Sequence, residues 1–128
     1  MYHNVYSKEE LYSMSTQQTF NNDASEAAFL LGGIGTGNIS LGARGEFRDW
    51  EIFNRPGKGN MLAYSFFAIR TSHKGQKPVS KVLEARINPP FSRSNGFSSS
   101  ELAGLPGFEK SIMRGEYPLV WIDFEDSS

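Results

Sequence analysis

The sequence contains no cysteine, which excludes disulfide bonds and cysteine-based metal sites. Its two histidines, His3 and His73, are far apart, and neither has a second histidine at ligand spacing, so we expect neither a metal nor another cofactor. The longest apolar run, residues 61–69, is too short to cross a bilayer. Residues 1–20 are polar and lack the apolar segment of a secretion signal. These absences predict a soluble, cytoplasmic protein without a transmembrane segment.

The sequence also has no strong excess of either charge. Its formal net charge is −1 and its isoelectric point is about 6.1, so no global field favours nucleic acid as a partner. The charges are unevenly placed, because residues 44–86 contain nine Lys or Arg and four Asp or Glu, whereas the segments on either side each have an acidic excess of three. A basic middle between acidic flanks indicates internal ion pairing or, alternatively, an anionic partner.

Short apolar runs separated by turn residues begin near Ala24 and are typical of an all-β domain. Residues 62–69 are apolar on both faces, which predicts a central, buried strand, whereas residues 82–87 alternate like a strand with one packed face. The length of 128 residues fits one domain, but many β-sandwiches are longer. We therefore expect an antiparallel β-sandwich, incomplete here, over residues 24–128. Its strands are expected at residues 27–31, 38–41, 47–53, 62–71, 79–87, 111–113 and 119–125.

The remaining segments have other signatures. Residues 7–11 begin with capping-box spacing and predict a short helix, but the polar segment 1–23 as a whole is expected to be mobile. Residues 73–77 are expected to form a hairpin tip. Residues 88–106 are rich in proline and serine and predict a long loop, of a length that in compact domains is functional or disordered.

Glycine is concentrated in one segment, because six of the thirteen glycines lie between Gly32 and Gly45. Such clustering marks turns with positive φ or the close approach of another backbone. A dinucleotide-binding fingerprint would need its third glycine at Asn38, and a P-loop would need a lysine there, so both motifs are rejected. The segment is therefore either a set of tight turns or a loop that forms an interface.

Acidic and basic side chains alternate just after the glycines. Closely spaced carboxylates are reminiscent of the acid and nucleophile of a glycosidase. Arginines are interleaved with them, however, and an ionised partner lowers a carboxyl pKa and suits an ion pair better than a general acid. We therefore expect structural ion pairing rather than catalysis. The carboxylates are those of Glu46, Asp49 and Glu51, and the arginines are Arg44, Arg48 and Arg55.

Two tryptophans are candidates for sugar binding. An aromatic ring can cover the apolar face of a pyranose, but tryptophan in a β-rich domain more often packs in the core. We expect a core position for Trp50 and Trp121, although both neighbours of Trp50 are charged.

The order of motifs in this region resembles a known family. A Leu-Gly-Gly-Ile-Gly-Thr-Gly turn at residues 31–37 is followed by Arg-Gly-Glu at 44–46, Arg-Asp-Trp at 48–50 and Asn-Arg-Pro at 54–56. This series resembles the N-terminal domain of the non-lysosomal glucosylceramidase (bile-acid β-glucosidase) family, glycoside hydrolase family 116, and looser similarity extends over residues 29–124. The resemblance implies a two-part enzyme, in which an N-terminal β-sandwich precedes an α-helical barrel that carries a glutamate nucleophile and an aspartate acid/base for retaining hydrolysis of β-glucosides.

The catalytic residues of that barrel have no matching positions here, so we assign no catalytic residue to this chain. The expected function is that of an N-terminal β-sandwich that packs on a catalytic domain of the same polypeptide and helps to shape the cleft for a β-glucoside or glucolipid. The alternative is a stand-alone carbohydrate-binding or interaction module. The residues whose chemistry suits contact with the other domain or the cleft are Gly33, Gly35, Thr36, Arg44, Glu46, Arg48, Asp49, Trp50 and Arg55.

Overall fold

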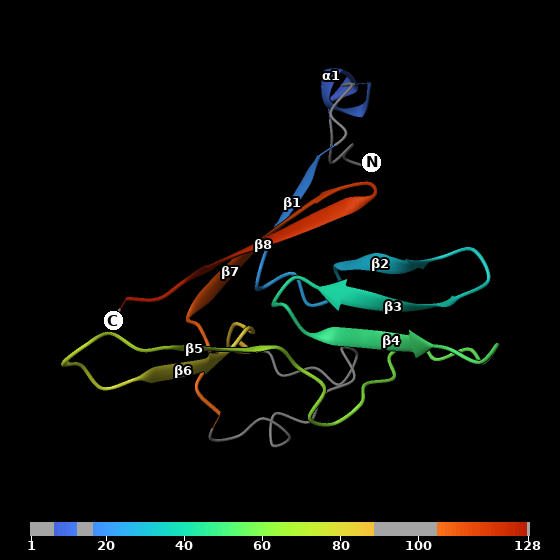
Figure 1. Ribbon diagram of the computed structural model, residues 1–128. Helices are drawn as coiled ribbons and strands as arrows, with labels where there is room; N and C mark the ends of the chain where they lie inside the picture. The colour runs from blue at the N-terminus through green and yellow to red at the C-terminus, as the bar shows by residue number, and fades with distance from the viewer. Residues whose placement is uncertain (1–6, 13–16, 89–104, 128) are drawn as a thin grey trace.

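The computed structural model describes residues 7–12, 17–88 and 105–127, and within these ranges the protein consists almost entirely of β-strands (Figure 1). The elements are α1 (Lys8–Leu11), β1 (Gln18–Asn21), β2 (Ala28–Gly33), β3 (Gly37–Gly42), β4 (Phe47–Glu51), β5 (Ala68–Thr71), β6 (Val79–Val82), β7 (Lys110–Glu116) and β8 (Leu119–Glu125). Adjacent strands pair in antiparallel fashion and form the sheets β1-β7-β8, β2-β3-β4 and β5-β6. The expected all-β fold is confirmed, and the three sheets are consistent with an incomplete β-sandwich.

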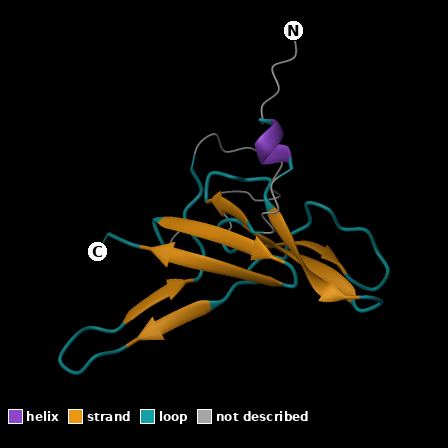
Figure 2. Cartoon of the chain, turned by 90° about the horizontal axis from the view of Figure 1, so that it is seen from above, coloured by secondary structure: helices purple, strands orange, loops and turns teal. Residues whose placement is uncertain are grey.

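The inner faces of the sheets meet around a small apolar centre. Along β8 every second side chain points inward, and Ile122 and Phe124 line a cavity of about 230 Å³ together with Leu41 of β3 and Phe47 of β4. Phe47 also packs edge to face on Phe67, with ring centroids 5.2 Å apart. The β5-β6 hairpin extends away from this centre, and its tip projects to the left in both Figure 1 and Figure 2. The apolar centre therefore lies between the sheets β1-β7-β8 and β2-β3-β4.

Several sequence-based predictions are confirmed at nearly the expected positions. The strands expected at residues 27–31, 38–41 and 119–125 correspond to β2, β3 and β8. The hairpin tip expected at residues 73–77 joins β5 to β6, and the short helix α1 begins one residue after the predicted start. Within the described residues, no helix is both long and apolar enough to span a membrane. The loop expected at 88–106 lies almost entirely outside the described residues.

Residues 62–69 do not form the central, buried strand that the sequence predicts. Residues 62–65 form a turn in which the Ser65 N–H donates to the Leu62 carbonyl at 3.3 Å, and Tyr64 has a φ of 62°. Only β5 is extended, and it pairs with β6 alone, with all four of its residues exposed. An apolar run predicts burial only if another element covers it, and here no second sheet covers β5 within the described residues.

The strand predicted at residues 79–87 is also shorter than expected. β6 ends at Val82, and the Leu83 N–H makes one more bond in the same register, to the Phe67 carbonyl at 2.7 Å. The Ala85 N–H donates to the Arg44 carbonyl at 2.8 Å, and the Arg86 N–H donates to the Phe108 carbonyl at 2.9 Å. Backbone partners from two other segments thus end the strand.

The polar segment before Ala24, which we expected to be mobile, contains a strand. β1 pairs along its whole length with β7, and the N–H of the buried Asn22 donates to the Ser111 carbonyl at 3.1 Å. A polar sequence cannot form a core by itself, but an available strand edge needs only the backbone groups of its partner. Pairing with the edge of β7 therefore places residues 18–21 in a strand, although their side chains show no apolar pattern in the sequence.

Candidate functional site

Most of the fully buried side chains of this domain are polar or charged. Among the described residues, four apolar side chains are buried, Ala43, Val82, Ala85 and Met113, against eight polar or charged ones. Buried charges are rare in proteins unless they are paired, because removing a charge from water is costly. The buried charged residues are Arg44, Glu46, Arg48, Asp49 and Glu84.

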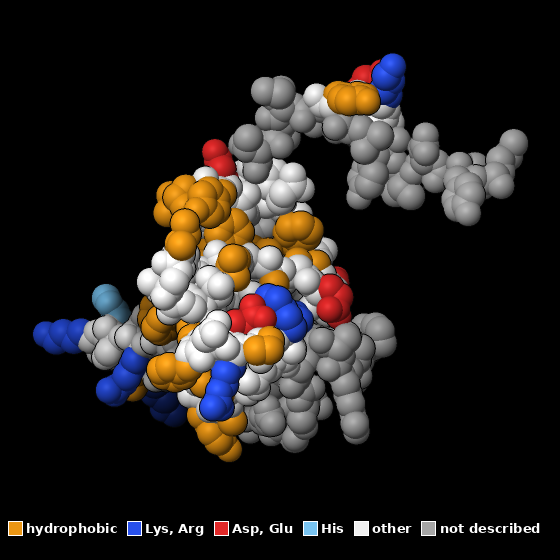
Figure 3. All heavy atoms as spheres, turned by 90° about the vertical axis from the view of Figure 1, so that its right-hand side faces the viewer, with side chains coloured by type: hydrophobic (Ala, Val, Ile, Leu, Met, Phe, Trp, Pro, Cys, Tyr) orange, Lys and Arg blue, Asp and Glu red, His pale blue; other side chains and the backbone are white. Residues whose placement is uncertain are grey.

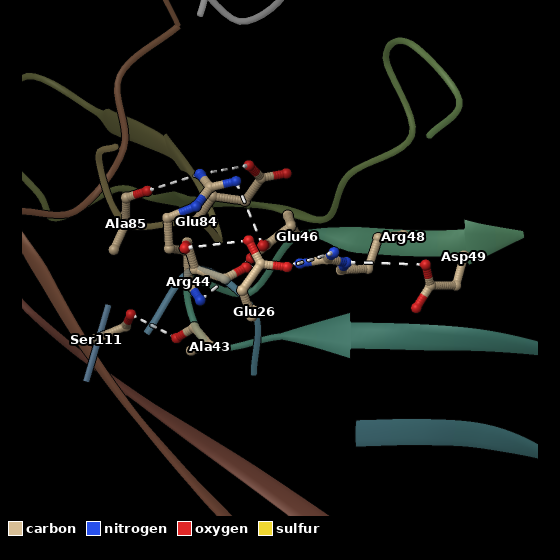
Figure 4. A network of polar contacts seen from close by, with 10 residues as sticks. Glu26, Ala43, Arg44, Glu46, Arg48, Asp49, Glu84, Ala85 and Ser111 are labelled. Atoms are coloured by element: carbon tan, nitrogen blue, oxygen red, sulfur yellow. Dashed lines mark hydrogen bonds and ion pairs between the residues drawn. The ribbon is translucent and has the colours of Figure 1, made fainter. Parts of the chain in front are cut away.

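Arg44 links two carboxylates from different parts of the chain (Figure 4). Its Nη2 atom lies 3.5 Å from Glu46 Oε1, and its Nη1 atom lies 3.9 Å from Glu84 Oε2. Nη1 also donates to the Ala85 carbonyl at 3.3 Å, while the backbone N–H of Arg44 donates to Glu46 Oε2 at 3.1 Å. One cation therefore ties the turn after β3 to the segment after β6.

The turn that carries Arg44 depends on glycine at two positions. A Cβ atom on Gly42 would lie 2.3 Å from the Glu46 carboxylate, and one on Gly45, which has a φ of 98°, would lie 2.5 Å from the Leu83 carbonyl oxygen. The Ser111 hydroxyl donates to the Ala43 carbonyl at 2.8 Å and holds the turn against β7. These glycines thus serve close internal packing.

Glu84 is the most perturbed carboxyl in the network. Burial raises the pKa of Glu84 to about 7; the Arg44 charge opposes this rise, and the Glu46 carboxylate adds to it. A protonated carboxyl beside another carboxylate is an arrangement that glycosidases also use for general acid catalysis. Here the side chains of Glu46 and Glu84 are only 1% and 5% exposed, and both are held by Arg44. The pair therefore acts as a structural element of the core.

Arg48 forms a second buried centre on β4. Its Nη1 atom donates to the Ser25 carbonyl at 2.7 Å, and its Nη2 atom lies 4.0 Å from Glu26 Oε2. Its Nε atom lies 3.9 Å from Asp49 Oδ1. Arg48 thus fastens the segment before β2 to β4, on the opposite side of the network from Arg44 (Figure 4).

Two carboxylates of β4 clamp the loop that follows it. Asp49 Oδ1 accepts a hydrogen bond from the Gly59 N–H at 2.7 Å, and Glu51 Oε1 accepts one from the Gly57 N–H at 3.3 Å. Lys58 Nζ lies between them, 3.7 Å from Asp49 and 3.1 Å from Glu51. The Gly-Lys-Gly sequence therefore returns to β4 and fixes the conformation of residues 52–60.

Asp49 is held ionised in a strained backbone conformation. Burial alone would raise the pKa of Asp49, but the hydrogen bonds from Gly59 and Ser40 and the charges of Lys58 and Arg48 lower it below its usual value. Its φ of 53° lies in the left-handed region, which costs about 1 to 3 kcal/mol in a residue other than glycine. The clamp on residues 57–59 compensates for this strain.

The glycine-rich turn between β2 and β3 borders a polar pocket. The Gly33 N–H donates to Thr36 Oγ1, and the Thr36 hydroxyl donates to the Gly33 carbonyl, both at 2.9 Å, so Thr36 closes the turn on itself. The pocket beside it has a volume of about 370 Å³, and its polar lining includes Asn38, Glu51 and Arg55. We call this cavity the turn pocket.

The two tryptophans occupy different environments. Trp50 is half-buried and packs edge to face on Phe47, with ring centroids 6.3 Å apart. Trp121 is 40% exposed on the outer face of β8, so the expected core position is wrong for this residue. The alternation along β8 explains the outcome, because Val120 and Ile122 point inward on either side of it.

The structure separates the nine residues expected at a domain contact or cleft into two groups. Arg44, Glu46, Arg48 and Asp49 are buried within the domain and Trp50 is half-buried, whereas Gly33, Gly35, Thr36 and Arg55 are exposed beside the turn pocket. The ion pairing predicted for Glu46 and Asp49 is confirmed, while Glu51 pairs with Lys58 rather than with an arginine. A contact of any of these residues with another domain stays a prediction.

Two residues that take part in these ion pairs were missed in the sequence analysis. Glu84 is 40 positions from Arg44, so no local spacing in the sequence connects the two residues. The apolar residues Val82 and Ala85 on either side of Glu84 are buried, and they were a sequence signal that Glu84 could be buried too. Lys58 stands between two glycines, and only the fold of the loop brings it to β4. Within the described ranges, no group of three or more His, Cys, Asp or Glu side chains is placed to hold a metal ion.

Comparison with known protein families gives one match. A family model described as beta-glucosidase 2, glycosyl-hydrolase family 116 N-term, matches residues 28–128. A search of curated proteins found no match. The matched range begins at the first residue of β2, contains the Arg44 network and the turn pocket, and covers more than half of the chain. The chain therefore belongs to glycoside hydrolase family 116, as the N-terminal β-domain of a glycosidase.

Proposed function

We propose that this β-domain packs on a catalytic domain of the same polypeptide and helps to shape the substrate cleft of a retaining β-glucosidase. The observation that carries the proposal is the distribution of polarity, because most of the fully buried side chains are polar or charged while large apolar side chains lie at the surface. Ile34 is fully exposed, and Phe53 and Phe67 are 87% and 65% exposed. Monomeric domains seldom leave such side chains in water unless another surface covers them.

The proposed contact surface is the turn face, which consists of residues 33–37 and 53–56. These segments lie side by side because Asn38 of β3 pairs with Glu51 of β4, so the turn before β3 meets the loop after β4. Both segments lie on the right in Figure 1, and Figure 3 views the molecule from that side, with hydrophobic side chains spread among charged ones. Exposed apolar groups beside an arginine match the composition of protein interfaces.

The buried ion pairs support this role indirectly. Asp49, Glu51 and Lys58 fix the loop after β4, and that loop presents Phe53 and Arg55 to the surface. A rigid loop at a domain boundary can form part of a cleft wall without carrying the chemistry itself. In this proposal residues 24–128 form the domain, and β1 of the preceding segment 1–23 adds to its sheet at the edge of β7. The enzyme is cytoplasmic, and the acid and nucleophile reside in the other domain.

The contact is tested in the full-length protein that carries this chain. Phe53→Ser and Ile34→Ser are expected to lower the unfolding free energy of that protein by about 2 kcal/mol each and to lower kcat/KM, because apolar contacts with the catalytic domain are lost. In the isolated chain the same substitutions should improve solubility. Val79→Ser is the matched control, since Val79 is 52% exposed on the hairpin at the opposite side of the molecule.

A loss of stability in the full-length protein, together with a gain of solubility in the isolated chain, identifies the contact. If both variants keep the melting temperature and kcat/KM of the full-length protein, the turn face is solvated surface and the interpretation as a stand-alone carbohydrate-binding or interaction module is favoured. Retention is tested separately, by following the anomeric configuration of the first-formed glucose with proton NMR. An α-anomer as the initial product from a β-glucoside would contradict a retaining mechanism.

A further inference from the structure

We propose that the turn pocket binds the hydroxyl groups of a neutral sugar, so that this domain contributes directly to carbohydrate recognition. The proposal rests on the proposed function, in which the turn face borders the substrate cleft. The pocket volume of about 370 Å³ lies at the lower end of the range for ligand sites and suits a single sugar ring.

The pocket exists because the chain reverses sharply after β4. The Arg55 N–H donates to the Ile52 carbonyl at 3.2 Å, and Phe53 and Asn54 both have a φ of 55°. Left-handed conformations in residues other than glycine cluster at ligand sites, where the surrounding structure maintains them. Opposite this turn, a Cβ atom on Gly37 would lie 3.0 Å from the Glu51 carbonyl oxygen, so glycine permits the close approach of the two walls.

The pocket presents polar groups that are available to a ligand. Among the described residues, the side chains of Asn38, Asn54 and Arg55 have no hydrogen-bond or ion-pair partner, although all three line the pocket. Glu51 is already oriented by Lys58 and by the Gly57 N–H, so its carboxylate can accept further hydrogen bonds in a fixed position. Two amides, a guanidinium and a carboxylate together match hydroxyl groups, which both donate and accept.

The charges in the pocket favour a neutral ligand. Arg55 would attract an anion, but the Glu51 carboxylate lines the same cavity and would repel it. A cation would be attracted by the Glu51 carboxylate but repelled by Arg55. A neutral polyol, whose hydroxyl groups both donate and accept hydrogen bonds, satisfies both of these groups.

The test is an NMR titration of the 128-residue chain with methyl β-D-glucoside. We expect saturable shifts of the amide signals of Gly33, Gly35 and Gly37, with a Kd on the order of 1 mM, as is usual for so small a ligand. Arg55→Gln and Asn54→Gly should each weaken binding about tenfold, through the loss of hydrogen bonds to the sugar. Glycine at position 54 retains the left-handed backbone, so that variant removes the amide alone.

Arg70→Gln is the matched control, because Arg70 is an exposed arginine on β5, away from the pocket, and binding by this variant should equal that of the wild type. The proposal is overturned if the sugar produces no saturable shifts, if both pocket variants bind like wild type, or if inorganic phosphate saturates the same signals more tightly than the sugar. The titration measures the pocket alone, whereas the stability of the full-length Phe53→Ser protein measures the domain contact. Failure of one proposal is therefore distinguishable from failure of the other.

Discussion

Replacing Glu84 with glutamine tests the charge balance at the centre of the domain. Burial raises the pKa of Glu84 to about 7, from an ordinary value of 4.5 to which it returns on unfolding. Between these values the folded protein retains a proton that the unfolded chain has released, so the free energy of unfolding falls as the pH rises. The contribution of this proton to the free energy of unfolding is fully present below pH 4.5 and is lost as the pH rises through about 7.

The magnitude follows from the gap between the two pKa values. A gap of roughly 2.5 pH units corresponds to a loss of about 3 kcal/mol across the window. Glutamine has nearly the shape of the protonated carboxyl and cannot ionise. Glu84→Gln should therefore match the wild type at about pH 4, below both pKa values, and exceed its stability by up to about 3 kcal/mol at about pH 8.5.

The assay is urea unfolding followed by tryptophan fluorescence at several pH values in this window. Taking the difference between variant and wild type cancels the titration of groups that both proteins share. Glu116→Gln is the matched control, because Glu116 is an exposed glutamate at the end of β7. A difference between Glu84→Gln and wild type that stays constant with pH would refute the reasoning, since Glu84 would then have the same protonation in the folded and unfolded states.

Three further outcomes are expected. Gly45→Ala should lose about 2 to 4 kcal/mol of unfolding free energy, because its Cβ would meet the Leu83 carbonyl, whereas Gly75→Ala at an open hairpin tip should lose about 1 kcal/mol from its φ alone, as urea unfolding will report. Asp49→Asn keeps a residue type that tolerates left-handed backbone but removes a charge with a lowered pKa. It should cost about 1 to 2 kcal/mol at neutral pH, and the cost should vanish as the pH falls and Asp49 protonates, in the same assay. The isolated chain should not hydrolyse an aryl β-glucoside; turnover abolished by Glu46→Gln would place an active site in this domain.

The class of the fold could be predicted from local pattern alone. Residues 119–125 were expected to form a strand and form β8, and Gly75 marks the hairpin tip between β5 and β6. The charged series at residues 44–51 also predicted ion pairing correctly, because arginines and carboxylates so close in the chain can meet in a simple turn and strand. These features depend on neighbours within a few positions, which the sequence displays directly.

The tertiary structure decided which surfaces are covered. Residues 62–69 are as apolar as a central strand, but a run of apolar side chains does not specify its partner, and here β5 pairs with β6 alone. Trp121 was wrongly expected in the core for a similar reason. An apolar residue type does not show which face of a strand it occupies, and the alternation of side chains along β8 places Trp121 outward.

The electrostatic centre required the fold as well. The sequence by itself determined that arginines and carboxylates stand together near Arg44, and that glycine permits a tight turn there. Only the fold brings Glu84 to Arg44 and Lys58 to Asp49, and only the fold removes most of these groups from water. The physical reason is that a pKa and an ion-pair energy depend on burial and on distances of a few ångströms, which chain separation does not encode.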